Sequence, residues 1–143
     1  MFRFRLQNVL DFREQQERAL ASQLAHAETL ERHAQARLDG LQATRVASAE
    51  QAAGPRSVGE LANMAFVLEQ LDDHIASAQE TVVAANETVS QVKGALTVAF
   101  QDRRVLDRLR DRHAETHRAS EDSHDRRMMD EIAITRYTHN ESL

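Results

Sequence analysis

Apolar residues recur at alternating steps of three and four over much of the second half of the chain. The run contains Leu61, Met64, Leu68, Leu71, Ile75, Ala78, Val82, Ala85, Val89, Val92, Leu96, Ala99, Arg103 and Leu106. Only Arg103 in this run is not apolar. A 3.5-residue repeat of this length is typical of a coiled-coil seam, in which side chains of one helix fill holes on another. The pattern therefore predicts a long helix from about residue 58 to about 138.

The first part of the chain carries a weaker version of the same pattern, interrupted by charge. Its members are Leu6, Leu10, Arg13, Glu17, Leu20, Leu24, Ala27, Glu31, Ala34, Leu38, Leu41 and Arg45. Gly54 and Pro55 end this segment, because glycine accepts the left-handed conformation past a helix end and proline cannot continue a helix. Ser57 and Glu60 then have the spacing of a capping box, which starts a helix.

These signals predict an all-α fold: a two-helix antiparallel coiled-coil hairpin with a much longer second helix. Residues 1–143 form a single domain in this prediction, with helix one at about 6–52, a turn at 53–57 and helix two at about 58–138. Two helices joined by so short a connection pack against each other in opposite directions.

A turn centred near residues 54 to 56 also predicts which residues face each other. Their numbers add to about 109, so that Leu38 meets Leu71 and Leu6 meets Arg103. Helix one is then too short to cover all of helix two, which has no intrachain partner from about residue 107 onward. We refer to this uncovered part as the overhang.

Composition and charge narrow the possible functions. The chain of 143 residues has 18 Lys and Arg against 23 Asp and Glu, and it has no cysteine. It has no apolar stretch near the roughly 20 residues of a membrane span, so we expect a cytoplasmic protein. The negative charge is concentrated in residues 58–101, where six acidic residues accompany Lys93 (−5). No basic segment stands unneutralised, so we expect no nucleic-acid partner.

Residues that carry chemistry are present but are not arranged for catalysis. Two long helices offer no concave site that would shift carboxylate pKa values, and no glycine-rich loop precedes a Lys-Ser/Thr pair. We therefore expect no enzymatic activity and no cofactor. A stripe of His113, His117, Glu121 and His124 lies on one helix face, but one exposed helix encloses nothing. We interpret it as a solvated face and expect no metal site, although the pattern alone leaves metal binding open.

Two apolar groups are not used by the seam. Phe66 and Val67 flank the start of helix two, where either packing against helix one or an exposed docking patch would explain them. The second group lies on the overhang and consists of Met128, Met129, Ile132, Ala133 and Tyr137. Methionine and aromatic residues on an unpaired helix favour binding to a partner.

Particular residues at both ends of the chain resemble a known family. The chain opens Phe2-Arg3-Phe4-Arg5-Leu6-Gln7-Asn8-Val9-Leu10-Asp11-Phe12-Arg13-Glu14-Gln15-Gln16-Glu17, and Met129-Asp130-Glu131-Ile132-Ala133 stands near its end. Together with a charged helical hairpin of this length, these segments resemble the FliJ family of bacterial flagellar export proteins, over essentially the whole chain.

The resemblance implies a non-enzymatic stalk and general chaperone component of the flagellar type III export apparatus. Its expected partners are the export ATPase ring, the membrane export gate protein and substrate-specific export chaperones, at the inner face of the cell membrane. The residues implied at the ATPase end are Phe2, Phe4, Met128, Met129, Ile132 and Tyr137. Those near the gate-binding stretch are Phe66, Val67, Leu71 and His74.

Two other interpretations remain open at this point. The equivalent stalk protein of an injectisome would share this fold and mechanism. A cytoplasmic coiled-coil scaffold unrelated to export would instead dimerise through the helix-two seam. We expect a monomer, because helix one already covers that seam.

Overall fold

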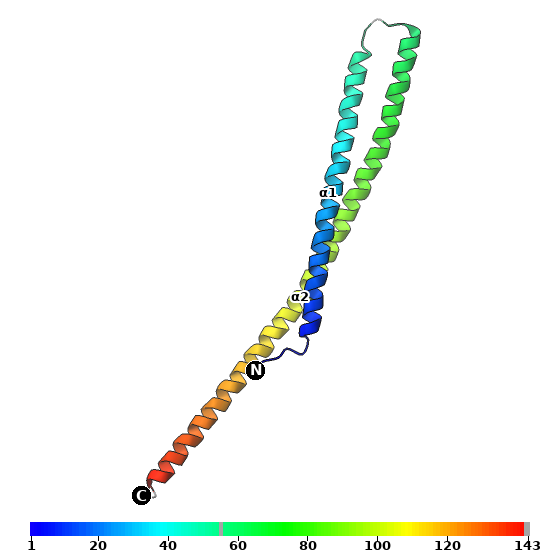
Figure 1. Cartoon of the computed structure of the whole chain (residues 1–143). Coiled ribbons are helices and arrows are strands. Elements are labelled where there is room, and N and C mark those ends of the chain that lie inside the picture. Colours follow the sequence, from blue (N-terminus) through cyan, green and yellow to red (C-terminus); the bar gives the residue numbers. More distant parts are fainter. Residues whose placement is uncertain (55, 142–143) are drawn as a thin grey trace. The chain divides into compact units, whose positions relative to one another are not determined.

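The computed structural model describes residues 1–54 and 56–141, and these residues form two α-helices (Figure 1). α1 spans Gln7–Gln51 and has 45 residues, whereas α2 spans Val58–Glu141 and has 84. The described residues contain no strand. The predicted fold class, a helical hairpin whose second helix is much longer, is confirmed.

The connection between the helices is built from the signals that the sequence contains. Gly54 has a φ of 157°, a conformation that residues with side chains rarely adopt. The Arg56 guanidinium donates a hydrogen bond of 2.7 Å to the carbonyl oxygen of Gln51, one of the acceptors that the end of α1 leaves unpaired. At the start of α2, the backbone N–H of Glu60 donates to the Ser57 hydroxyl at 3.2 Å, which is an N-cap bond.

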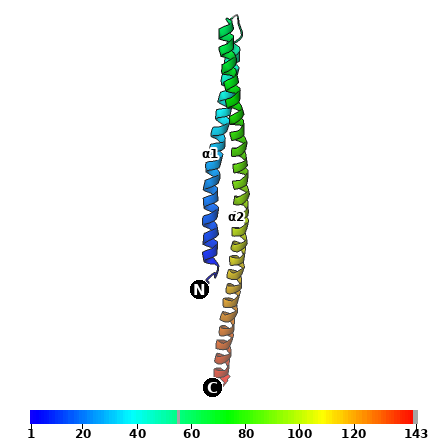
Figure 2. The ribbon, with the colours of Figure 1, turned by 90° about the vertical axis from the view of Figure 1, so that its right-hand side faces the viewer.

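The structure divides into two compact units, of which Glu17–Val98 is the first. Within it, α1 and α2 lie side by side in opposite directions, as Figures 1 and 2 both show. Leu38, Ala78 and Val82 form a buried cluster, and Ala34, Leu41 and Ile75 pack against it. All of these residues belong to the predicted seams, so the periodic pattern correctly identified the core of the hairpin.

Burial follows the predicted seams closely along both helices. Every seam member from Leu10 to Arg45 and from Met64 to Leu106 is buried or half-buried. The prediction is wrong for the first member of each run, because Leu6 is 39% and Leu61 is 47% exposed. Leu61 lies beside the carboxy-terminal end of α1, where a facing helix is no longer available, whereas Leu6 lies in the turn just before the first residue of α1.

The predicted register between the helices is wrong by one heptad. Leu38 packs with Ala78, and the same cluster contains Leu41 with Ile75 and Ala34 with Val82, so facing residue numbers add to about 116 instead of 109. The connection does not cause this shift, because the residues that flank it, Gln51 and Val58, have numbers that add to 109. The ion pair of Arg45 with Asp72 fits the observed register. A shift of seven residues keeps the same side chains in the seam and moves only their partners.

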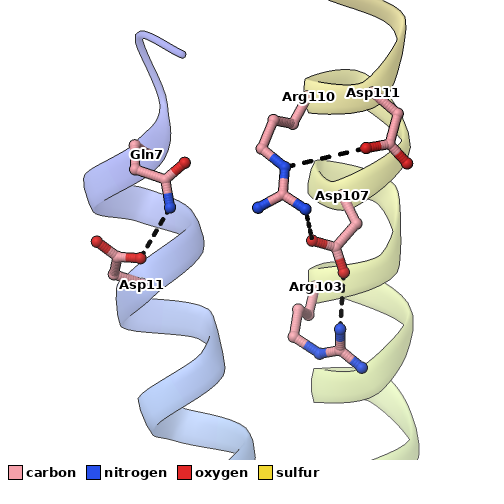
Figure 3. Close-up of polar contacts among 6 residues, drawn as sticks. All are labelled: Gln7, Asp11, Arg103, Asp107, Arg110 and Asp111. Carbon is pink, nitrogen blue, oxygen red and sulfur yellow. Dashed lines mark hydrogen bonds and ion pairs between the residues drawn. The ribbon is translucent and has the colours of Figure 1, made fainter. Parts of the chain in front are cut away.

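The second unit contains residues 1–16 and 99–141. Here the first turns of α1 pack against α2, and Leu10 is completely buried. Arg13 and Asp102 form an ion pair of 3.6 Å between the helices. Within α1, the Gln7 side-chain amide donates a hydrogen bond of 2.9 Å to Asp11 (Figure 3).

The overhang starts later than predicted, because contacts of the amino-terminal segment reach well past residue 107. Phe4 is only 8% exposed, and its ring contacts His113, while the ring of Phe2 contacts His117. From residue 118 to residue 141 every position is exposed. The one-heptad register shift, together with a nonhelical segment before α1, accounts for this additional coverage.

Neither helix, over the part of the chain that the structure describes, has the length and hydropathy that a membrane span requires.

Candidate partner-binding surfaces

The last turns of α2 carry an exposed apolar group. Met128 is 49%, Met129 is 69%, Ile132 is 47% and Tyr137 is 67% exposed, and these four residues are among those assigned to a partner surface by sequence. The structure adds Ile134, which is 65% exposed and which the sequence analysis did not single out. Its only signal in the sequence is its apolar character, because it falls outside the spacing of the other members. We refer to these five residues as the carboxy-terminal apolar group.

Phe2 and Phe4 do not join that group. The centroids of the Phe4 and His113 rings are 5.7 Å apart at an interplanar angle of 74°, and the Phe2 and His117 rings are 5.7 Å apart at 64°. Both are edge-to-face contacts, the favoured arrangement of aromatic pairs. Met128 lies eleven residues beyond His117, or about 16 Å along a helix at its standard rise. The two phenylalanines therefore fasten the amino terminus to α2, which is a structural role that the sequence analysis missed.

The histidine stripe is the other half of this contact. His113 and His117 receive the two phenylalanine rings, and His117 Nδ1 lies 3.6 Å from a Glu121 oxygen. Ser120, Glu121, His124 and Asp125 line a shallow hollow on the same helix. Within residues 1–54 and 56–141, no three His, Cys, Asp or Glu side chains are grouped so that they could hold a metal ion. The spacing Phe-x-Phe opposite His-x-x-x-His was the available sequence signal for the aromatic contact.

The group near the start of α2 is divided by the fold. Leu71 is half-buried in the seam, whereas Phe66 is 61% exposed, Val67 is 47% exposed and His74 is exposed. Of the two explanations that the sequence left open for Phe66 and Val67, the exposure agrees with an accessible patch rather than with packing against α1. Phe66, Val67 and His74 form what we refer to as the α2-start patch.

An ion pair between the helices lies close to this patch in sequence. Arg45 Nε donates to Asp72 Oδ1 at 2.6 Å, and Arg45 Nη2 lies 3.5 Å from Asp72 Oδ2. The hydrogen bond from Arg45 lowers the pKa of the Asp72 carboxyl below its usual value, and Arg45's positive charge adds to this effect. The same hydrogen bond, together with the negative charge of Asp72, raises the pKa of Arg45. Because the pair joins α1 to α2, it holds the two helices in their register next to the patch.

The fold and its surfaces together define a class of protein: a coiled-coil hairpin with exposed apolar groups on its helices. Residues 1–142 match the family described as Flagellar FliJ protein, and the chain belongs to this family. Members of this family are stalk components of flagellar protein export, and it is not known as a family of enzymes. No curated protein and no solved structure gave a match to the chain.

Proposed function

We propose that the chain is a non-enzymatic stalk and general chaperone component that couples the flagellar export ATPase ring to the membrane export gate. In this role it associates peripherally with the inner face of the cell membrane and needs no cofactor or nucleic acid. Membership of the FliJ family supports the export function. The observation that carries the coupling role is the pair of exposed apolar surfaces, one in each compact unit.

The carboxy-terminal apolar group is the proposed contact with the ATPase ring. Five large apolar side chains within ten residues are between 47% and 69% exposed. Burying one such side chain completely is worth roughly 1.5 to 3 kcal/mol, so a partner that covers several of them gains substantial binding free energy. A few large apolar or aromatic residues typically carry most of the affinity of an interface. No α1 residue covers this part of α2, so the group is available to a partner without unfolding the hairpin.

The α2-start patch is the proposed contact with the export gate protein. Phe66 and Val67 are adjacent exposed apolar residues, and His74 follows Val67 after one heptad, which places both on the same side of the helix. Leu71 contributes from the seam beneath and supports the helix rather than offering a free surface. Substrate-specific export chaperones complete the proposed set of partners.

The ATPase contact is tested with two substitutions and a matched control. Ile132→Asp combined with Tyr137→Asp places charge on the group, and we expect it to abolish both co-purification with the export ATPase and stimulation of ATP hydrolysis. The control is Ala119→Asp, which changes an exposed residue of the overhang that does not belong to the group, and we expect it to behave like the parent. Circular dichroism should show unchanged helix content for all three proteins. Full stimulation by the double variant would refute the proposed contact.

The gate contact has its own test, independent of the ATPase. Phe66→Asp should weaken binding to the purified cytoplasmic part of the gate protein at least tenfold, because the exposed ring would no longer be buried in the complex. Ala62→Asp, which alters an exposed small residue one turn earlier, is the control. Equal binding by both variants would show that the patch is not the gate contact.

A further inference from the structure

Methionine is the only sulfur-containing type of residue in the chain, and two of its methionines lie in the carboxy-terminal apolar group. The chain contains four Met and no Cys. Met128 and Met129 are adjacent, and they are 49% and 69% exposed. Met64 is half-buried in the hairpin seam, whereas Met1 is exposed at the amino terminus. The surface proposed to contact the ATPase ring therefore presents two thioethers to any oxidant in solution.

The surrounding helix leaves both methionines accessible. Every position from residue 118 to residue 141 is exposed. Ile132 follows both methionines after about one turn of α2, and Tyr137 follows Met129 after about two turns. The two thioethers therefore belong to the same apolar surface as Ile132 and Tyr137. A chemical change at either sulfur alters this surface without disturbing the buried cluster of the hairpin.

We propose that oxidation of Met128 and Met129 to methionine sulfoxide reversibly prevents the carboxy-terminal apolar group from binding the export ATPase. The inference rests on the proposed function and concerns the regulation of that contact. With hydrogen peroxide as the oxidant, a lone pair of the thioether sulfur forms an S–O bond while the O–O bond breaks. The sulfur loses two electrons, and the peroxide is reduced and leaves as water. Methionine sulfoxide reductases reverse the reaction with electrons from a thiol.

The oxidised group loses affinity because a sulfoxide is polar. Oxidation converts a flexible apolar side chain into one that carries a hydrogen-bond acceptor, a change that disrupts interfaces rich in methionine. In the free chain the new oxygen stays hydrated, because both residues are exposed. In the complex the oxygen is buried against apolar atoms, where an acceptor without a donor is costly. The cost therefore falls on the complex alone, and we expect the affinity to fall at least tenfold.

The fold protects the methionine whose oxidation would damage the hairpin. Met64 is half-buried in the seam of the Glu17–Val98 unit, so peroxide reaches it less easily. A sulfoxide at Met64 would place a polar atom among apolar neighbours. Met1 is exposed but lies outside the group, which makes it an internal reference for the reactivity of an open thioether. We expect Met128 and Met129 to react at a rate similar to that of Met1 and at least about fivefold faster than Met64.

Limited treatment of the full chain with hydrogen peroxide tests the proposal. Catalase removes the peroxide before the purified export ATPase is added, so that only this chain is oxidised. Peptide mass spectrometry locates the sulfoxides, and a titration measures binding to the ATPase. We expect sulfoxide at Met128 and Met129, binding that is at least tenfold weaker, and an unchanged melting temperature by circular dichroism. Treatment with the methionine sulfoxide reductases for both sulfoxide epimers should restore binding.

Variants separate the two thioethers of the group from the other two. Met128→Leu combined with Met129→Leu keeps apolar side chains of similar volume that peroxide does not oxidise, so peroxide treatment should leave the affinity of this variant unchanged. Met64→Leu is the matched control, and treatment should weaken its binding as much as it weakens that of the parent. Met128→Gln combined with Met129→Gln places a polar amide at both positions, and it should weaken binding at least tenfold without any oxidant.

Each negative outcome has a separate meaning. If the untreated parent binds the ATPase and the oxidised parent binds it equally well, the inference is overturned while the proposed contact stands. If treatment weakens the Met128→Leu, Met129→Leu variant as much as the parent, oxidation acts through another residue, and the inference is again overturned. If the untreated parent does not bind the ATPase at all, the proposed function fails and the inference fails with it.

Discussion

Substituting Phe4 by alanine should detach the amino-terminal segment from α2. Phe4 is 8% exposed, and its ring meets His113 edge-to-face, so the substitution removes most of a buried aromatic side chain. Complete burial of a phenylalanine is worth roughly 1.5 to 3 kcal/mol. This gain must offset the conformational entropy that the segment loses on ordering, which costs about 1 to 2 kcal/mol per residue. A loss of about 2 kcal/mol is therefore enough to release the segment and loosen the first turns of α1.

Amide hydrogen exchange measured by mass spectrometry reports this local opening directly. A loss of about 2 kcal/mol corresponds to roughly 30-fold faster exchange, and we expect it for the first turns of α1 but not for the Glu17–Val98 unit. Phe12→Ala is the matched control, because Phe12 lies in the first turns of α1 but is 57% exposed. Alanine has the highest helix propensity, so exchange in the control should stay the same or slow down.

A double-mutant cycle identifies the partner of the ring. If Phe4 acts through His113, then His113→Ala should accelerate exchange in the same region. The change in the free energy of opening in the combined variant should then be smaller than the sum of the changes in the two single variants. Coupling of about 0.5 to 1.5 kcal/mol is typical of an aromatic pair. Equal exchange in Phe4→Ala and Phe12→Ala would refute the reasoning, since it would mean that the buried and exposed rings contribute alike.

Three further predictions concern the hairpin. Ile75→Asp should destabilise it by about 3 kcal/mol or more in urea unfolding, because it places a charge against the buried cluster, whereas Ala76→Asp at the adjacent exposed position should change stability little. Asp72→Asn should remove stability mainly above pH 4 to 5. The native pKa of Asp72 is lowered, so the ionised carboxylate stabilises the fold at pH values above its unfolded pKa. This stabilisation is lost as the pH falls through the native pKa. Unfolding monitored over a pH series should show the two proteins converging in acid. A chain that stops after Arg118 should melt at nearly the parent temperature by circular dichroism, since every later described residue is exposed, and a large drop would mean that this segment is packed.

The seam was predictable because burial in a two-helix coiled coil depends on local spacing. Each helix must present apolar residues every 3.5 positions to its partner, and this requirement is visible without knowledge of the partner's position. Leu38, Ala78 and Val82 are buried for this reason. The connection between the helices was predictable for a similar reason, since Gly54 and Ser57 act only through their own backbone and that of their neighbours.

The candidate surfaces were predictable only in part. Met129 and Tyr137 are exposed because α1 is too short to reach them, which follows from helix lengths alone. The placement of Phe2 and Phe4 depends instead on a nonhelical segment that folds onto distant residues. The Phe-x-Phe and His-x-x-x-His spacings do not by themselves bring the two segments together, because the energy of the contact comes from burial between parts of the chain far apart in sequence.

The register error shows which residues distinguish one heptad from the next. A seven-residue slip leaves every apolar seam position apolar, so the seam pattern alone cannot choose between the two pairings. The charged residues that interrupt the seam of α1 can distinguish the two pairings. In the expected register Arg45 would face Met64, and Arg13 would face Leu96. In the structure Arg45 reaches Asp72 and Arg13 reaches Asp102. An exposed ion pair adds little by itself, but a guanidinium held against an apolar seam loses hydration without compensation. The charges that weaken the seam of α1 as a pattern are therefore the residues that favour its observed register.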